Sequence, residues 1–158
     1  MQTDPSPQEP IDSDVDLWRP RPARRREGEL TVVAVIAVGG AIGASARYLV
    51  GLAWPRPSGS LPWATMTINV VGCALIGILM VLVSEVWIQQ RLLRPFLGTG
   101  ILGGFTTFST YAVDIQRLIA DHHPGIALAY LFATVAGALA AVWAAAKATR
   151  TLITRRLR

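Results

Sequence analysis

Four long apolar segments limit this chain to a narrow set of folds. A helix needs about 20 mostly apolar residues to cross the hydrocarbon core of a membrane. Four segments of the 158-residue chain reach that length, and they run over residues 30–54, 63–87, 95–120 and 125–148. The connections between them are short and contain turn-forming residues, as in "PRPSGSLP" and "DHHP". The sequence therefore predicts an all-α integral membrane protein with four transmembrane helices.

Most of the charge lies outside these segments. Residues 1–29 carry five prolines, seven of the ten acids and five arginines, with little to bury, so we expect a disordered tail there. This tail lacks the apolar stretch and cleavage site of a signal peptide. Its basic run is expected to set membrane topology and to contact anionic lipid. We thus divide the chain into an N-terminal tail (1–29), a membrane domain (30–148) and a basic C-terminal tail (149–158).

The basic residues also predict an orientation. Four spans place both termini and the second connection on one side, which then carries twelve Lys and Arg residues. The other side carries Arg56 and Arg117, and Arg47 lies within the first span. Because positive charge favours the cytoplasmic side, both termini are predicted to be cytoplasmic.

Ionisable and amide side chains at membrane depth are costly, so each one suggests a role. Arg47 lies about two turns from the end of its span, where it could snorkel to the interface or face the helix bundle. Asn69 in the second span could bond a neighbouring helix, which is the usual role of such an amide. Asp114 could serve a vestibule or cap the third span near water. The chain shows no catalytic constellation and no ATP-binding motif, so we expect no enzyme.

The third span contains the stretch "GILGGFTTFSTYAVD", residues 100–114. Gly103 and Gly104 favour a break in this helix, because glycine weakens a helix and frees backbone groups. Such a break is tolerated at membrane depth only where it is buried or lines a wet cavity. Its free carbonyls could hold a cation, as in transport proteins. Close packing of an unbroken helix is the alternative.

Aromatic and hydroxyl side chains follow the two glycines. Phe108 and Tyr111 are three residues apart and share one helix face, while Thr107 and Thr110 share an adjacent face. The electropositive edge of an aromatic ring can approach an anion without a formal charge. Rings beside hydroxyl and amide donors would form a weakly binding anion path, which conduction requires. Ordinary core packing is the competing interpretation of the two rings.

Three blocks in this order, "GGAIGASARY", "TINVVGCALIG" and "GILGGFTTFSTYAVD", resemble the small bacterial fluoride channels called Fluc or CrcB. The resemblance covers residues 30–148. It implies an antiparallel, dual-topology dimer of four-helix subunits in the bacterial plasma membrane. Such a dimer passes fluoride down its electrochemical gradient, so that fluoride entering as hydrogen fluoride leaves the cell and its toxicity falls.

The resemblance also implies roles for individual residues. A structural sodium ion at the dimer interface would be held by the backbone carbonyls of Gly103 and Thr106. Asn69 would be the pore amide, Phe108 an aromatic of the fluoride path, and Arg47 and Asp114 structural or vestibule groups. The remaining path residues would be Ser109, Thr110, Tyr111, Tyr130 and Thr134.

Two positions depart from the family pattern. Tyr111 stands where the family usually has Phe, so it keeps a ring edge and adds a hydroxyl. Ala138 stands where the fourth helix would carry another hydroxyl, which shortens the hydroxyl track begun by Tyr130 and Thr134.

The unequal charge distribution bears on the partner. An antiparallel homodimer needs one sequence to insert in both orientations, for which balanced Lys and Arg are expected. We therefore hypothesise that this subunit inserts mainly one way and pairs with an oppositely oriented homologue, with a homodimer as the alternative.

Another function class competes with the channel. A proton-coupled exporter of the small multidrug type also has four helices, but it needs an intramembrane carboxylate in its first span, and this chain has none there. Only Asp114 could replace it. A structural subunit without transport would leave the polar third span unexplained.

Overall fold

The structure is a computed structural model that describes residues 23–54, 57, 59–87 and 89–156. Within these residues every regular element is helical. In chain order they are α1 (Ala23–Ala53), α2 (Trp63–Glu85), the π-helix η1 (Pro95–Leu102), α3 (Gly103–Phe105), α4 (Ser109–Ala120) and α5 (Pro124–Arg156).

Three of these helices are long and apolar enough to cross a membrane: Gly28–Ala53 within α1, the whole of α2, and Pro124–Arg155 within α5. This confirms an all-helical membrane protein. The third predicted span begins at Pro95 and ends at Ala120 as expected, but it is divided into η1, α3 and α4.

Two helices extend into segments predicted as tails. Helix α1 begins at Ala23, inside the predicted N-terminal tail, and α5 continues to Arg156 through most of the predicted C-terminal tail. The extension of α1 (23–29) is rich in Ala, Arg and Glu, which favour helix even when exposed, and the extension of α5 (149–156) contains three Arg and a Leu beside three Thr. The predicted tail residues 1–22 and 157–158 lie outside the described residues.

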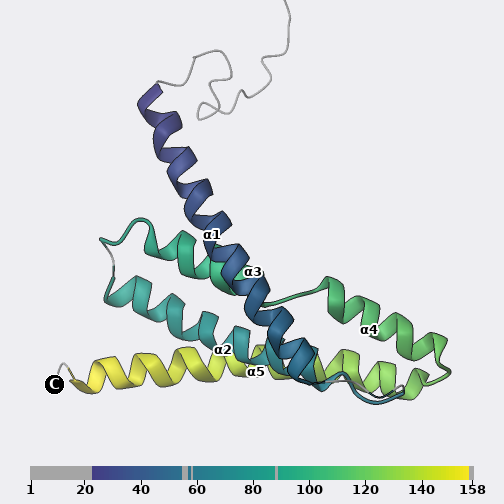
Figure 1. Cartoon of the computed structure of the whole chain (residues 1–158). Helices are drawn as coiled ribbons and strands as arrows, with labels where there is room; N and C mark the ends of the chain where they lie inside the picture. Colours follow the sequence, from purple (N-terminus) through teal and green to yellow (C-terminus); the bar gives the residue numbers. More distant parts are fainter. Residues whose placement is uncertain (1–22, 55–56, 58, 88, 157–158) are drawn as a thin grey trace, which may run out of the picture.

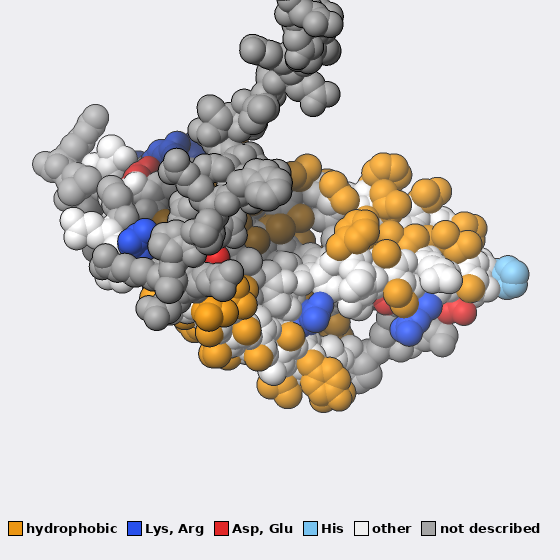
Figure 2. All heavy atoms as spheres, turned by 90° about the horizontal axis from the view of Figure 1, so that it is seen from above, with side chains coloured by type: hydrophobic (Ala, Val, Ile, Leu, Met, Phe, Trp, Pro, Cys, Tyr) orange, Lys and Arg blue, Asp and Glu red, His pale blue; other side chains and the backbone are white. Residues whose placement is uncertain are grey.

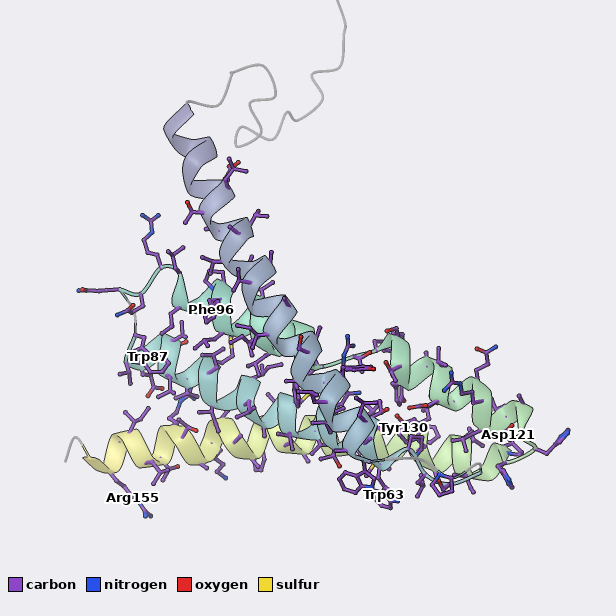
Figure 3. The ribbon with its side chains drawn as sticks, in the orientation of Figure 1. Trp63, Trp87, Phe96, Asp121, Tyr130 and Arg155 are labelled. Carbon is purple, nitrogen blue, oxygen red and sulfur yellow. The ribbon has the colours of Figure 1, made fainter. Side chains whose placement is uncertain are left out.

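The helices form two packed groups that meet at the middle of the molecule (Figure 1). Helix α2 runs along α5, and α1 crosses η1 and α3. Helix α4 leaves the second group and packs on the first half of α5. One end of the molecule holds the first described turns of α1, the last turns of α5 and the start of η1 (Figure 1). Figure 3 labels Trp87 and Arg155 at this end. Trp63 and Asp121 lie toward the other.

Close approach of glycines joins α1 to the third span. A Cβ at Gly39 would lie 2.6 Å from the carbonyl oxygen of Phe96, and one at Gly43 would collide with the carbonyl of Ile101. On the facing helix, a Cβ at Gly100 would lie 3.0 Å from the Cα of Gly39. Small residues at four-residue spacing allow this approach where apolar burial gives no driving force between membrane helices. Gly39 and Gly43 thus serve close packing of α1 against the third span.

The glycines of the third span do not break it. Gly103 and Gly104 continue the helix from η1 into α3, and a Cβ at Gly104 would collide with the carbonyl of Gly40. The predicted position of the break was therefore wrong: Gly104 serves close packing against α1. The interruption falls at residues 106–108, between α3 and α4.

The outer surface is strongly apolar. Large hydrophobic side chains on α1, α2, α4 and α5 are exposed, among them Leu49, Phe132 and Leu139, and they spread over the face seen in Figure 2. A surface of this kind suits lipid rather than water. A small buried cluster of Tyr111, Leu118, Ala127 and Tyr130 holds α4 on α5.

Candidate functional site

Asn69 of α2 bridges the break in the third span. Its side-chain Nδ2 donates to the carbonyl of Thr107 at 2.9 Å, and its Oδ1 accepts from the N–H of Thr107 at 2.9 Å. Thr106 is extended, with φ −73° and ψ 156°, so the backbone turns out of the helix just before this pair. Gly72 lies one turn along α2 from Asn69, and a Cβ there would collide with the Thr106 methyl group. The absence of a side chain at Gly72 therefore allows the broken segment to approach α2. The amide of Asn69 thus satisfies both backbone groups of the residue at the break.

The break releases two backbone carbonyls from helical bonding. In a continuous α-helix the N–H of Thr107 would bond to Gly103 and the N–H of Thr110 to Thr106. Here the first N–H donates to Asn69 and the second to the Thr107 Oγ1 at 3.1 Å. The carbonyls of Gly103 and Thr106 are therefore without their helical partners.

Thr107 starts the second half of the span. Its Oγ1 accepts from the Thr110 N–H three residues later, which is the N-cap geometry that satisfies a free donor at a helix start. The same hydroxyl donates to the Thr110 Oγ1 at 3.1 Å and lies 3.2 Å from the Ser109 Oγ. The hydroxyls of residues 107, 109 and 110 thus form one cluster at the start of α4.

A cavity of about 410 Å³ lies beside the break. It is lined by Asn69, Cys73, Gly103, Thr106, Thr107, Phe108, Tyr111, Thr134, Val135 and Ala138. None of these lining residues carries a formal charge. Six of the predicted site residues meet here, from α2, the broken span and α5.

The two predicted path aromatics differ in exposure. Phe108 is 80% exposed, whereas Tyr111 is 7% exposed. Their ring centroids are 5.9 Å apart with the planes tilted by 50°. The Tyr111 hydroxyl donates to the Leu131 carbonyl of α5 at 2.9 Å. The extra hydroxyl relative to Phe therefore anchors α4 to α5 and fixes the ring orientation.

Thr134 of α5 is a buried polar residue of the cavity lining. It is 4% exposed, and its Oγ1 has no hydrogen-bond partner among the described residues. A buried hydroxyl without a partner is costly, so a site of this kind usually receives a water or a ligand. Tyr130, one turn earlier, is fully buried (Figure 3), and its ring centroid lies 5.3 Å from that of Tyr111. It lies behind Tyr111 and is absent from the cavity lining.

Asp114 belongs to a different cavity. Its Oδ2 accepts from the Thr65 hydroxyl at 2.7 Å, and the carboxylate is buried. Both residues, with Trp54, Ser60 and Arg117, line a second cavity of about 430 Å³ between the ends of α1 and α4. Asp114 thus faces a cavity rather than capping the span at the surface.

Arg47 is not brought to the site. It lies half-buried on α1 and appears in the lining of neither cavity. Among the described residues it has no hydrogen-bond or ion-pair partner. A bond from Asn69 to a neighbouring helix was predicted, but its partner Thr107 was not. The Thr65 bond to Asp114 and the Tyr111 bond to the Leu131 carbonyl were not predicted either. A Thr just before a helical segment is an N-cap signal, so the role of Thr107 was readable from the sequence.

A divided membrane helix beside an uncharged cavity with a few polar groups defines an integral membrane protein with an interior site. A family profile described as "CrcB-like protein, Camphor Resistance (CrcB)" matches residues 34–146. The chain belongs to this family.

Curated relatives are similar over most of the chain. The "Fluoride-specific ion channel FluC 2" of Streptomyces avermitilis is 61% identical over 117 residues, which cover 72% of this chain and 74% of that protein. The "Fluoride-specific ion channel FluC 1" of Streptomyces coelicolor is 57% identical over 122 residues, which cover 77% and 79%. The "Fluoride-specific ion channel FluC 2" of Nocardia farcinica is 51% identical over 121 residues, which cover 77% and 86%.

The amide pair at the break leads to a prediction about stability. Asn69→Leu leaves the N–H and the carbonyl of Thr107 unpaired, at a cost of about 1–3 kcal/mol for each group. Asn69→Asp keeps the acceptor for the N–H but loses the donor to the carbonyl, so its loss should be intermediate. Thermal unfolding of the purified variants in detergent measures both. Thr134→Val is the matched control, because it removes a hydroxyl that has no partner, and it should unfold no earlier than wild type. Equal melting temperatures for Asn69→Leu and wild type would contradict the assigned role.

Proposed function

We propose that this chain is the subunit of a fluoride-specific ion channel that exports cytoplasmic fluoride passively. Its relatives at 51–61% identity bear that name. The observation that carries the proposal is the juxtaposition in one uncharged cavity of the Asn69 amide, the exposed Phe108 ring and the buried Thr134 hydroxyl without a partner. Neutral donors bind an anion weakly enough to release it, which conduction requires.

Each path residue has a separate task in this proposal. The side-chain Nδ2 of Asn69 donates one N–H to the Thr107 carbonyl, and its second N–H is the amide donor for the ion. Phe108 offers its ring edge, and the Thr134 hydroxyl donates from the opposite wall of the cavity. Tyr111 also offers a ring edge. Its hydroxyl donates to the Leu131 carbonyl, so the ring and not the hydroxyl is the group for the ion. Ser109, Thr110 and Tyr130 extend the hydroxyl track on either side of the cavity.

A structural sodium ion fits the carbonyls that the break releases. Sodium is a hard cation that prefers oxygen ligands, and the carbonyl oxygens of Gly103 and Thr106 have lost their helical N–H partners. The ion would supply a positive charge that holds the two halves of the span in the broken geometry. The remaining ligands would come from a second subunit.

We further propose that the functional unit is an antiparallel dimer of four-span subunits in the bacterial plasma membrane. Phe108 is 80% exposed in the single subunit, so a second subunit is needed to enclose the path. In this arrangement Asp114 serves the vestibule as the acceptor for Thr65, and Arg47 supports the bundle structurally. Both termini of this subunit lie on the cytoplasmic side.

The proton-coupled exporter is less well supported. Its essential carboxylate would have to be Asp114, which is bonded to Thr65 and lines the other cavity. A carboxylate remote from Asn69 and Phe108 could not exchange its proton with a substrate bound there.

Fluoride flux tests the proposal. The purified chain in liposomes should release fluoride rapidly without a proton gradient and should retain chloride, as measured with ion-selective electrodes. Phe108→Ile keeps an apolar side chain and removes the ring edge, so it should slow fluoride release about five- to tenfold, since an aromatic contact is worth about 1 kcal/mol. Phe132→Ile is the control, because Phe132 is also an exposed aromatic (67%) but lies outside the cavity lining.

Release that requires a proton gradient would contradict the channel and favour the exporter. Unchanged flux in Phe108→Ile would remove that ring from the proposed path. If the chain alone is silent, flux restored by co-reconstitution with an oppositely oriented homologue would support the heterodimer, whereas continued silence would count against the channel.

The orientation proposal has its own test. Because twelve Lys and Arg residues lie on the side of the termini and two on the other, the chain expressed alone should insert with both termini cytoplasmic. Labelling of single cysteines placed at each terminus in intact cells, in a Cys73→Ala background, measures the orientation. Equal labelling from both sides would show dual insertion and favour the homodimer.

A further inference from the structure

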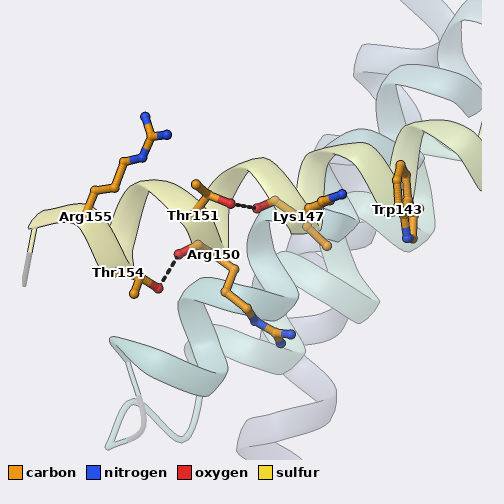
Figure 4. A pocket seen from close by; sticks show the side chains of 7 residues that line it. Trp143, Lys147, Arg150, Thr151, Thr154 and Arg155 are labelled. Atoms are coloured by element: carbon orange, nitrogen blue, oxygen red, sulfur yellow. Dashed lines mark hydrogen bonds between the residues drawn. The ribbon is translucent and has the colours of Figure 1, made fainter.

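The last turns of α5 carry a stripe of cationic side chains above an exposed tryptophan. The stripe comprises Lys147, Arg150 and Arg155, and with Trp143, Thr151 and Thr154 it lines a shallow cavity of about 510 Å³ (Figure 4). We call Lys147, Arg150 and Arg155 the basic stripe. It begins 17 residues after Tyr130 along α5, toward the opposite end of the helix from Pro124.

The length of α5 places the basic stripe at the membrane interface. The helix has 33 residues and is thus about 50 Å long, whereas the hydrocarbon core is about 30 Å thick. Its final turns must therefore lie among the lipid headgroups if its apolar part spans the core. Trp143 is 65% exposed, as expected for an aromatic anchor at that boundary.

The cations of the stripe are partly oriented by the protein. The Lys147 Nζ lies 4.8 Å from the centroid of the Trp143 ring. The Arg150 Nε donates to Glu85 at the end of α2 at 3.0 Å, while the Arg150 side chain remains 70% exposed. The threonine hydroxyls donate within the helix, to the carbonyls of Lys147 and Arg150 (Figure 4). The donors available to an anion are therefore the ammonium and guanidinium groups.

Apolar surface continues directly below these cations. Leu139 lies one turn before Trp143 on the same face, and the two are 64% and 65% exposed. A ligand that matches this surface has an anionic head and a long apolar tail. We propose that the basic stripe is a headgroup site for an anionic phospholipid, whose phosphate contacts Lys147 and Arg155 while an acyl chain lies along Trp143 and Leu139.

The cations of this site lie outside the matched family region, whereas Trp143 and Leu139 lie within it. The family profile ends at residue 146, one residue before Lys147. The proposed site therefore depends on the C-terminal extension of α5 and not on the cavity at the break.

Lipid titration followed by native mass spectrometry tests the proposal on the full chain. The probes are phosphatidylglycerol and phosphatidylcholine with identical acyl chains. The variant Lys147→Gln/Arg155→Gln keeps the Arg150 bond to Glu85, so it should melt at the wild-type temperature in lipid-free detergent. Its affinity for phosphatidylglycerol should fall about thirtyfold, because each cation near the surface contributes about one factor of five, while binding of phosphatidylcholine should not change.

The control Arg91→Gln/Arg94→Gln removes two positive charges at the same end of the molecule. A loss in this control as large as in the stripe variant would overturn the site and indicate general electrostatic attraction. Unchanged phosphatidylglycerol affinity in the stripe variant would also overturn it. Displacement of the lipid by excess inorganic phosphate would show a site for a free anion instead. Loss of a dimer in the stripe variant would show that a second subunit occupies this surface.

Discussion

The structure depends on the two hydrogen bonds between the side-chain amide of Asn69 and the backbone of Thr107. At membrane depth lipid offers no hydrogen bonds, so the N–H and carbonyl groups freed at a break need partners in the protein or in a wet cavity. Asn69 supplies both partners for Thr107, and the hydroxyl of Thr107 supplies the next one for Thr110. These bonds turn a costly interruption into a stable end of one helix and start of another.

Two consequences follow from this arrangement for transport. The break adjoins a cavity whose lining residues are all uncharged and include a few polar groups, and it leaves the carbonyls of Gly103 and Thr106 without helical partners. The same few residues can thus offer side-chain donors to an anion and backbone oxygens to a cation. The close glycine contacts of α1 with η1 and α3 hold the first half of the broken span in place.

The sequence predicted the elements better than the contacts. Hydrophobic length located the three helices that are long enough to span a membrane, and the start at Pro95 and the end at Ala120 of the divided third segment were found because proline and the "DHHP" turn mark them. The break was misplaced because glycine weakens a helix in isolation, whereas Gly104 here faces the backbone of Gly40 and serves packing. The true position depends on the partner Asn69, which is 38 residues away along the chain. No local signal encodes such a pair. The start of α1 was missed because the charged, proline-rich residues 1–29 were taken to be disordered, although Ala, Arg and Glu favour helix. The end of α5 was missed because the segment was ended where the apolar residues end, at 148.

Hydrogen exchange at the amide of Thr107 tests the central claim most directly. In the wild-type protein this amide should exchange slowly although it lies in a break beside a cavity, because it donates to the Asn69 Oδ1. In Asn69→Leu its exchange should accelerate, while the amide of Ala112, which donates to Phe108 within the helical start of α4, should stay protected. Rapid exchange of the Thr107 amide in the wild-type protein would contradict the account.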